Sequence, residues 1–262
     1  MHPAGLYVVE RSAVSGAAPL VVFVHGSPDR SQSFIRAVEL LGDVRTVIYD
    51  RRGYGQSLGA RPEATSIADH VADLLALIDG GPATIIGHSF GGVVAMAAAA
   101  SRPQVVDSLG LWEPPLPWLA WWPEWARRAV ADIGADPNPL VVGEQAFKTV
   151  VGRRSWDALT AEQRDLARAE GAAFLTDTGT QRTAPFDLND VAAPCLVGFG
   201  TATWRHQVDG AERLSELLGA ELMGVEGAGH FGHATHPEGF AQFVRRAVAL
   251  GREVPAAIEG CD

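Results

Sequence analysis

The chain has 262 residues, 47% apolar and 20% charged, which is a globular composition with room for one large domain or one domain with an insertion. Its formal net charge of −10 argues against nucleic acid and anionic membranes as partners, since both are negatively charged. No apolar run reaches the ~18 residues that span a bilayer, and the N-terminus lacks the basic-then-apolar order of a signal peptide, so we expect a cytoplasmic protein without a membrane partner.

Short strands and helices alternate along the first 112 residues. Apolar, β-branched runs that end in turn residues are typical of buried strands, and apolar spacings of three and four residues are typical of an amphipathic helix. A regular alternation of the two predicts parallel strands joined by crossover helices. We expect strands at 6–10, 20–24, 45–49, 83–87 and 105–112, and helices at 33–41, 66–78 and 93–100.

The pattern changes after Glu113, where prolines and tryptophans crowd together. Helices are expected at 124–133, 143–151 and 160–176, and no buried strand follows until 195–199. We therefore expect a helical cap, or lid, at 114–188, inserted into a core domain made of 1–113 and 189–262. The tryptophans either pack this cap onto the core or line a pocket for an apolar substrate, and both readings stay open for Trp118, Trp121, Trp122 and Trp125. The core pattern then resumes with a helix at 208–218, a strand at 220–225, a helix at 237–250 and a loose tail from 251.

Several residues have plain structural interpretations. Cys195 lies in an apolar run and is expected to be buried, and Cys261 lies in the tail. Neither belongs to a disulfide framework or a metal-binding motif, so we expect no metal and no cofactor. The arginine pairs 51–52, 153–154 and 245–246 are interpreted as solvated faces.

A candidate nucleophile lies in the sequence Gly87-His88-Ser89-Phe90-Gly91. It stands between an expected strand and an expected helix, where a sharp turn would lift the central hydroxyl above the end of the strand. The turn would also place it at a helix N-terminus, which favours negative charge. This context makes Ser89 a candidate for attack on a carbonyl carbon.

A serine hydroxyl needs a base to take its proton. His230 is the candidate, because it lies in a loop of small residues after the last expected strand. His233 and His236 are nearby competitors, and a structural role suits His236, which precedes a proline. His70 is expected to be exposed on its helix.

The attack on a carbonyl puts negative charge on oxygen, which needs two backbone N–H donors. The N–H of Phe90, directly after the nucleophile, is the first candidate. The N–H of Ser27, in the loop that follows the strand at 20–24, is the second, since Gly26 lets the backbone approach closely.

Four segments together resemble the α/β-hydrolase superfamily, in the group of esterases, epoxide hydrolases, haloalkane dehalogenases and haloperoxidase-like enzymes. They are His25-Gly26-Ser27-Pro28, the stretch 50–57 (DRRGYGQS), Gly87-His88-Ser89-Phe90-Gly91-Gly92 and Gly229-His230-Phe231. The resemblance implies a doubly wound, mostly parallel sheet with a helical cap between two late strands.

One position departs from the family pattern. Most relatives carry the acid of the catalytic triad after the strand here expected at 195–199, where this chain has Thr203. Some relatives carry it at the end of the preceding strand, which here is Glu113, followed by two prolines. Glu113 is therefore the candidate acid and Asp209 the alternative. A chain without any acid would lack control of the histidine tautomer.

The residues favour acyl chemistry. Ser89 argues against the epoxide hydrolases and dehalogenases, which attack with an aspartate. We expect a serine hydrolase that cleaves an ester-like bond of a small apolar substrate, as a carboxylesterase or lactonase does, through an acyl-enzyme. The alternatives are a C–C bond hydrolase, a cofactor-free haloperoxidase or perhydrolase, and a non-catalytic member that binds a small molecule.

Overall fold

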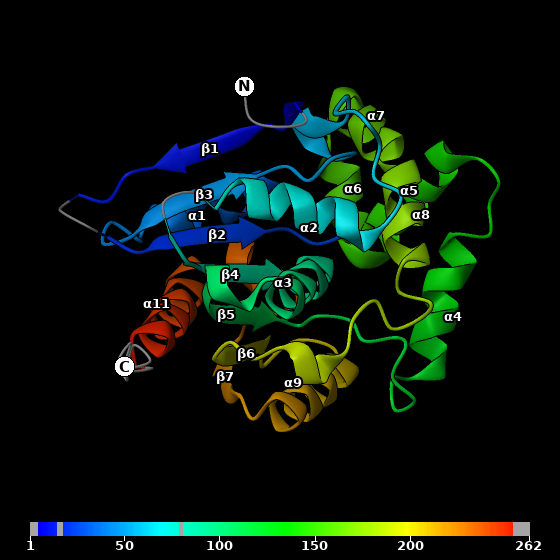
Figure 1. The fold of residues 1–262 in the computed structure, drawn as a ribbon. Coiled ribbons are helices and arrows are strands. Elements are labelled where there is room, and N and C mark those ends of the chain that lie inside the picture. The colour runs from blue at the N-terminus through cyan, green and yellow to red at the C-terminus, as the bar shows by residue number, and fades with distance from the viewer. Residues whose placement is uncertain (1–4, 15–17, 79–80, 254–262) are drawn as a thin grey trace.

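The computed structural model describes residues 5–14, 18–78 and 81–253, and its seven described strands form one sheet (Figure 1). Their order is β1-β3-β2-β4-β5-β6-β7, with β1 antiparallel to β3 and every other pair parallel. This confirms the expected doubly wound, mostly parallel sheet, and each strand lies within two residues of its expected range. The strands are β1 Val8–Arg11, β2 Leu20–Val24, β3 Arg45–Tyr49, β4 Ala83–His88, β5 Val106–Trp112, β6 Cys195–Gly200 and β7 Glu221–Val225.

Helices cover both faces of the sheet, so its central strands are buried on both sides. Every residue of β2 is buried. Val22 packs into an apolar cluster with residues of α2, α3 and α9, whereas its neighbour Val21 packs into a second cluster with residues of α1 and α11. These helices are α1 Ile35–Val38, α2 Ile67–Ala76, α3 Phe90–Ser101, α9 Arg205–Leu218 and α11 Pro237–Glu253.

Five helices lie between β5 and β6 in the chain and beyond the carboxyl ends of the parallel strands in space (Figure 1). We call them the insertion: α4 Glu124–Ile133, α5 Pro139–Val150, α6 Arg153–Ala158, α7 Ala161–Ala169 and α8 Gly171–Gly179. Because the carboxyl ends of parallel strands carry the ligand site in folds of this class, the insertion lies on the side of the sheet where chemistry is expected.

The expected helices of the insertion needed two corrections. Helix α5 begins at Pro139 rather than 143, since the side chain of Asn138 accepts a hydrogen bond from the N–H of Leu140 and starts the helix earlier. The single helix expected at 160–176 is wrong. It is divided into α7 and α8 just before Gly171, where any Cβ would collide with the carbonyl oxygen of Pro139, so α8 packs closely against α5.

Smaller differences occur at other helix ends. The helix expected at 33–41 is a 3-10 turn, η2 Ser31–Phe34, followed by the short α1. A short helix, α10 Gly232–Thr235, follows His230 in what was expected to be a loop. Helix α11 continues to Glu253, past the start of the expected tail, and residues 254–262, including Cys261, lie outside the described part. Cys195 is buried, as expected.

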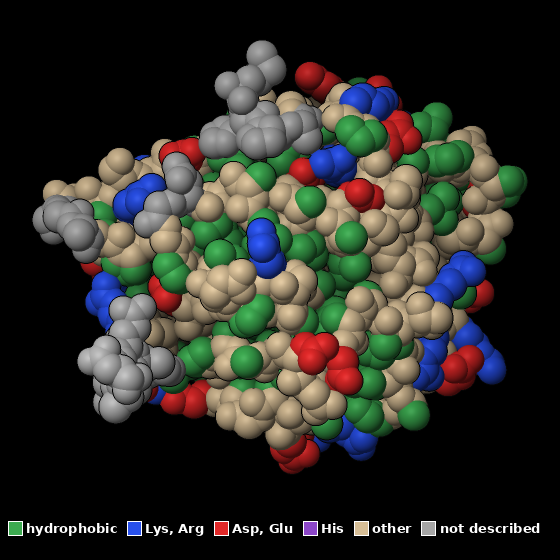
Figure 2. Space-filling view, in the orientation of Figure 1, with side chains coloured by type: hydrophobic (Ala, Val, Ile, Leu, Met, Phe, Trp, Pro, Cys, Tyr) green, Lys and Arg blue, Asp and Glu red, His purple; other side chains and the backbone are tan. Residues whose placement is uncertain are grey.

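Charged side chains are dispersed on the face of the molecule shown in Figure 2, with acidic and basic groups interspersed. Among the described helices, none combines the length and the apolar character needed to cross a bilayer.

Candidate active site

Ser89 occupies a sharp turn between β4 and α3. Its backbone has φ 51° and ψ −124°, a strained conformation for a residue other than glycine. The turn leaves no room for side chains on either side: a Cβ at Gly87 would lie 2.5 Å from the Cα of Gly92, and one at Gly91 would collide with the carbonyl of Val24. The N–H of Ser89 donates to the carbonyl of Trp112 at 2.8 Å, which ties the turn to the end of β5. Local packing therefore supports the turn expected around Ser89.

Glu113 and His230 form a buried hydrogen-bonded pair. Glu113 follows β5 with a φ of 46°, and its Oε2 lies 2.7 Å from Nδ1 of His230. The carboxylate also accepts hydrogen bonds from the N–H of Gly200 and from the hydroxyl of Thr203, both at 2.9 Å. A proton on Nδ1 directed at a carboxylate leaves Nε2 free to act as a base.

Thr203 occupies the position at which most relatives carry the triad acid. Its hydroxyl instead contacts the carboxylate of Glu113, which comes from the neighbouring strand. The ends of β5 and β6 are neighbours in the sheet, so an acid on either strand reaches the same histidine. Asp209, the alternative acid, lies on α9, half-exposed, and pairs with Arg205 at 2.7 Å. The carboxylate that contacts His230 is therefore that of Glu113.

The loop after β2 lies directly against the nucleophile. A Cβ added to Gly26 would stand 2.8 Å from the Cβ of Ser89. The next residue, Ser27, engages Arg51, Tyr54 and Asp177 through its hydroxyl, and no hydrogen bond found among the described residues uses its backbone N–H. Phe90 is the first residue of α3, where a helix N–H has no partner within the helix. Both expected oxyanion donors therefore belong to segments that border Ser89.

A second cluster lies next to His230. The Oδ2 of Asp29 is 3.2 Å from Nδ1 of His88 and 3.1 Å from Nε2 of His233, and the rings of His88 and His230 are 4.7 Å apart. These three residues are the one group in the described part of the chain whose donor atoms are close enough to hold a metal ion. Hydrogen bonds from the two imidazole rings to the carboxylate of Asp29 explain why these atoms lie together, without a metal ion. Burial and the neighbouring imidazoles lower the pKa of His88, which favours its neutral form.

The four tryptophans at 118–125, in α4 and just before it, differ in their surroundings. Trp122 is buried, and Trp118 and Trp121 are partly buried, with Trp118 packed edge-on against Phe186. Trp125 is 60% exposed and meets the ring of His206 at 4.7 Å. Packing of the insertion therefore accounts best for the first three.

The sequence did not single out Trp204. Its ring lies 5.9 Å from that of His230 and stacks on His206, yet it is 49% exposed. Its position directly after Thr203 was the only available signal. Trp204 and Trp125 share His206 as a neighbour, so they form an aromatic ridge that runs from His230 to α4.

Two expectations about polar residues were wrong. Arg51 and Arg52 are buried rather than solvated, since each forms an ion pair with a buried carboxylate, Asp177 and Asp73 respectively. His70, expected on the exposed side of its helix, is also buried, with Nε2 3.1 Å from Asp177.

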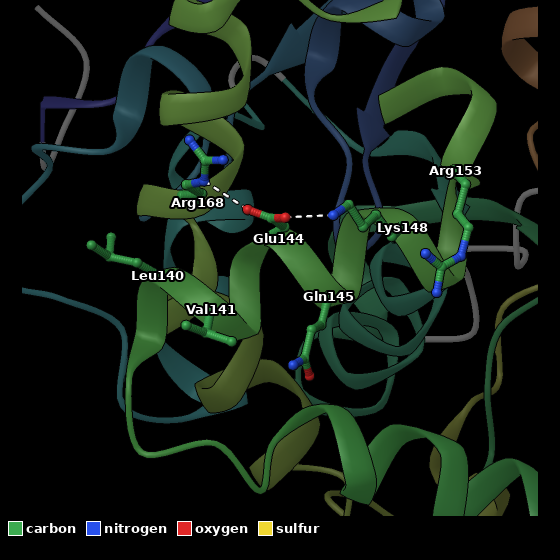
Figure 3. Close-up of a pocket in the computed structure, with 7 residues that line it drawn as sticks. All are labelled: Leu140, Val141, Glu144, Gln145, Lys148, Arg153 and Arg168. Atoms are coloured by element: carbon green, nitrogen blue, oxygen red, sulfur yellow. Dashed lines mark hydrogen bonds and ion pairs between the residues drawn. The ribbon is translucent and has the colours of Figure 1, made fainter. Parts of the chain in front are cut away.

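The cavity of about 390 Å³ shown in Figure 3 lies within the insertion and includes none of the candidate catalytic residues. Glu144 lies between Lys148 and Arg168 and accepts hydrogen bonds from both, so its carboxylate is engaged by two basic side chains of the same lining. Arg153 also lines this cavity, and it and Arg154 are exposed, as expected.

Residues 21–243 match the model of the alpha/beta hydrolase family. Since this match spans most of the chain, the chain belongs to that family, as its sequence motifs implied.

A segment of 109 residues is 38% identical to the lipase LipV of Mycobacterium tuberculosis, covering 40% of this chain and 41% of LipV. The chain thus aligns with less than half the length of the first curated relatives that it matches. Among solved structures it is similar to a carboxylesterase from the thaumarchaeon Nitrososphaera gargenis, with a TM-score of 0.71, 19% identity and coverage of 96% of this chain and 97% of that one. It is also similar to an enol-lactonase from Burkholderia xenovorans, with a TM-score of 0.70, 19% identity and coverage of 93% of this chain and 96% of that one. At these identities the structural likeness shows the fold.

Proposed function

We propose that the chain is a serine hydrolase that cleaves ester-like acyl bonds of small, apolar substrates, as carboxylesterases and lactonases do. The observation that carries the proposal is the buried Glu113–His230 pair next to the strained turn of Ser89. The names of the lipase, carboxylesterase and enol-lactonase relatives agree with acyl chemistry.

The reaction follows from the roles of these groups. The hydroxyl oxygen of Ser89 attacks the carbonyl carbon while Nε2 of His230 takes its proton, and Glu113 stabilises the imidazolium that forms. The oxyanion accepts hydrogen bonds from the N–H groups of Phe90 and Ser27. When the tetrahedral intermediate collapses, His230 returns the proton to the leaving alcohol. Water then repeats the sequence on the acyl-enzyme and releases the acid.

The insertion, with its flanks at 114–188, is proposed as the lid of this site, over a core made of 1–113 and 189–262. Half-exposed Trp204, beside His230, supports an apolar group as the part of the substrate nearest the base.

C–C bond hydrolysis and perhydrolysis would use the same residues, and no observation favours either over ester cleavage. The alternative of a non-catalytic binding protein rested on the absence of an acidic residue at position 203, where this chain has Thr203. The contact between Glu113 and His230 removes that support.

Turnover of p-nitrophenyl acetate and butyrate, with Ser89→Ala as the control, tests the proposal. Wild type should turn over both esters and react with a fluorophosphonate, and the variant should do neither. A wild-type protein that fails in both assays contradicts the serine-hydrolase function.

A further inference from the structure

The fully buried guanidinium of Arg51 forms hydrogen bonds with the loop that carries Ser27, the proposed oxyanion donor. Arg51 donates through Nε to the carbonyl of His25 at 3.0 Å and through Nη2 to the carbonyl of Gly26 at 2.9 Å. Nη2 also donates to the hydroxyl of Ser27 at 2.8 Å. In addition, the backbone N–H of Arg51 donates to the ring of His25 at 2.8 Å. One side chain thus fixes three consecutive residues of the loop.

The partner of this guanidinium comes from the insertion. Asp177, on α8, faces Arg51 with both oxygens, at 2.7 Å from Nη2 and 3.2 Å from Nη1. It also accepts hydrogen bonds from Tyr54 at 2.7 Å and from the hydroxyl of Ser27. Burial opposes the charge on both partners. Asp177 nevertheless raises the pKa of Arg51, and Arg51 lowers the pKa of Asp177, so the first stays cationic and the second anionic.

The contact with Gly26 has an electronic consequence. The carbonyl of Gly26 and the N–H of Ser27 belong to the same peptide group. A cationic donor on the oxygen of a peptide group polarises it and strengthens its N–H as a donor, because hydrogen bonds in a chain reinforce one another. The Gly26 position is also the part of the loop that lies against Ser89.

We propose that the Arg51–Asp177 ion pair orients and polarises the Gly26–Ser27 peptide as an oxyanion donor, so that a helix of the insertion takes part in building the oxyanion hole. Arg51 and Asp177 are positioning residues, since neither needs to touch the substrate. This inference rests on the proposed serine-hydrolase function. It predicts that loss of the pair weakens binding of the transition state more than binding of the ester.

The structure provides a matched control. Arg52 and Asp73 form an adjacent buried ion pair, with Nε of Arg52 2.7 Å from the carboxylate. The other hydrogen bond of Arg52 goes to the carbonyl of Pro62, so none of its contacts reaches the loop after β2. Removing either pair deletes one buried cation and one buried anion, but only the first removal frees the peptide that holds Ser27.

The test compares Arg51→Met/Asp177→Leu with Arg52→Met/Asp73→Leu, after circular dichroism has shown that both are folded. For the first variant kcat for p-nitrophenyl acetate should fall about 10- to 100-fold, part of the loss that follows removal of an oxyanion donor, with KM within about two-fold of wild type. Affinity for a boronic acid that forms a tetrahedral adduct with Ser89 should fall by a similar factor. The second variant should keep wild-type kcat.

Equal losses of kcat in the two folded variants, or unchanged boronic acid affinity in the first, overturn the inference. If the first double variant does not fold, Arg51→Lys replaces it. Lysine keeps the positive charge beside Asp177, but its single nitrogen cannot hold the carbonyls of His25 and Gly26 as the two nitrogens of Arg51 do, so a fall in kcat at constant KM is still expected. Turnover by wild type and its loss in Ser89→Ala are measured alongside, so failure of the serine-hydrolase function itself is recognised separately.

Discussion

Backbone strain within the described residues collects at two neighbouring positions. Ser89 and Glu113 are the only non-glycine residues there with positive φ, and each directly follows a strand, β4 and β5 respectively. Strain of this kind persists only where the surroundings enforce it, and it gathers at functional sites. Ser89 was expected in such a turn from its flanking glycines. No local pattern predicted the strained backbone of Glu113, since it depends on how β5 leaves the sheet.

At the scale of single residues, Glu113→Gln should lower kcat roughly 10⁴-fold, because an amide allows the wrong tautomer of His230 and cannot stabilise its charged form. Asp209→Asn, at the surface pair with Arg205, should leave kcat unchanged. Steady-state kinetics with p-nitrophenyl butyrate measures both. The reverse order of effects would move the triad acid to Asp209.

The elements differ in how far the sequence predicted them. The strands were located well because their apolar runs are short, rich in β-branched residues and bounded by turn residues, and these three features together distinguish a buried strand from a buried helix. The division between α7 and α8 was missed because it depends on contact of Gly171 with a different helix, α5. The burial of Arg51 was missed for a related reason: its partner Asp177 is 126 positions away, and an arginine is buried only where such a partner meets it.

The aromatic ridge gives a prediction at the scale of elements. Trp204→Ala should raise KM for p-nitrophenyl butyrate roughly 10-fold, equivalent to ~1.4 kcal/mol, and should affect the acetate ester less, because the larger acyl group leaves more apolar surface uncovered. A panel of esters graded by acyl length measures this. Trp125→Ala, on the far side of His206, should raise KM less. A larger effect of Trp125→Ala than of Trp204→Ala would place the acyl group away from His230.

The stability of the whole molecule should depend on a buried histidine. His25 accepts a hydrogen bond from the N–H of Arg51, and burial, with the charge of Arg51 as the next cause, lowers its pKa from 6.5 to about 4. Between these values the unfolded chain binds a proton that the folded protein does not, so stability falls as pH drops from 6.5 towards 4. His88, whose pKa is also lowered, acts in the same direction.

At pH 5 the contribution of His25 alone should lower the free energy of unfolding by about 2 kcal/mol relative to pH 7.5. Urea denaturation at the two pH values measures it. His25→Asn lacks the titrating ring. The difference between its free energies of unfolding at pH 7.5 and pH 5 should therefore be smaller than that of wild type by about 2 kcal/mol. An identical pH dependence in wild type and variant would show that His25 does not keep its neutral form by burial.

The proposed mechanism requires Ser89 to form an acyl-enzyme. The most direct measurement is rapid acid quenching of wild type mixed with p-nitrophenyl acetate, followed by mass spectrometry of the peptides. We expect one acetyl group per chain, on Ser89, within the first turnover, and none in Ser89→Ala. Turnover of the ester without an acetylated Ser89, or with the acetyl group on another residue, would contradict the account.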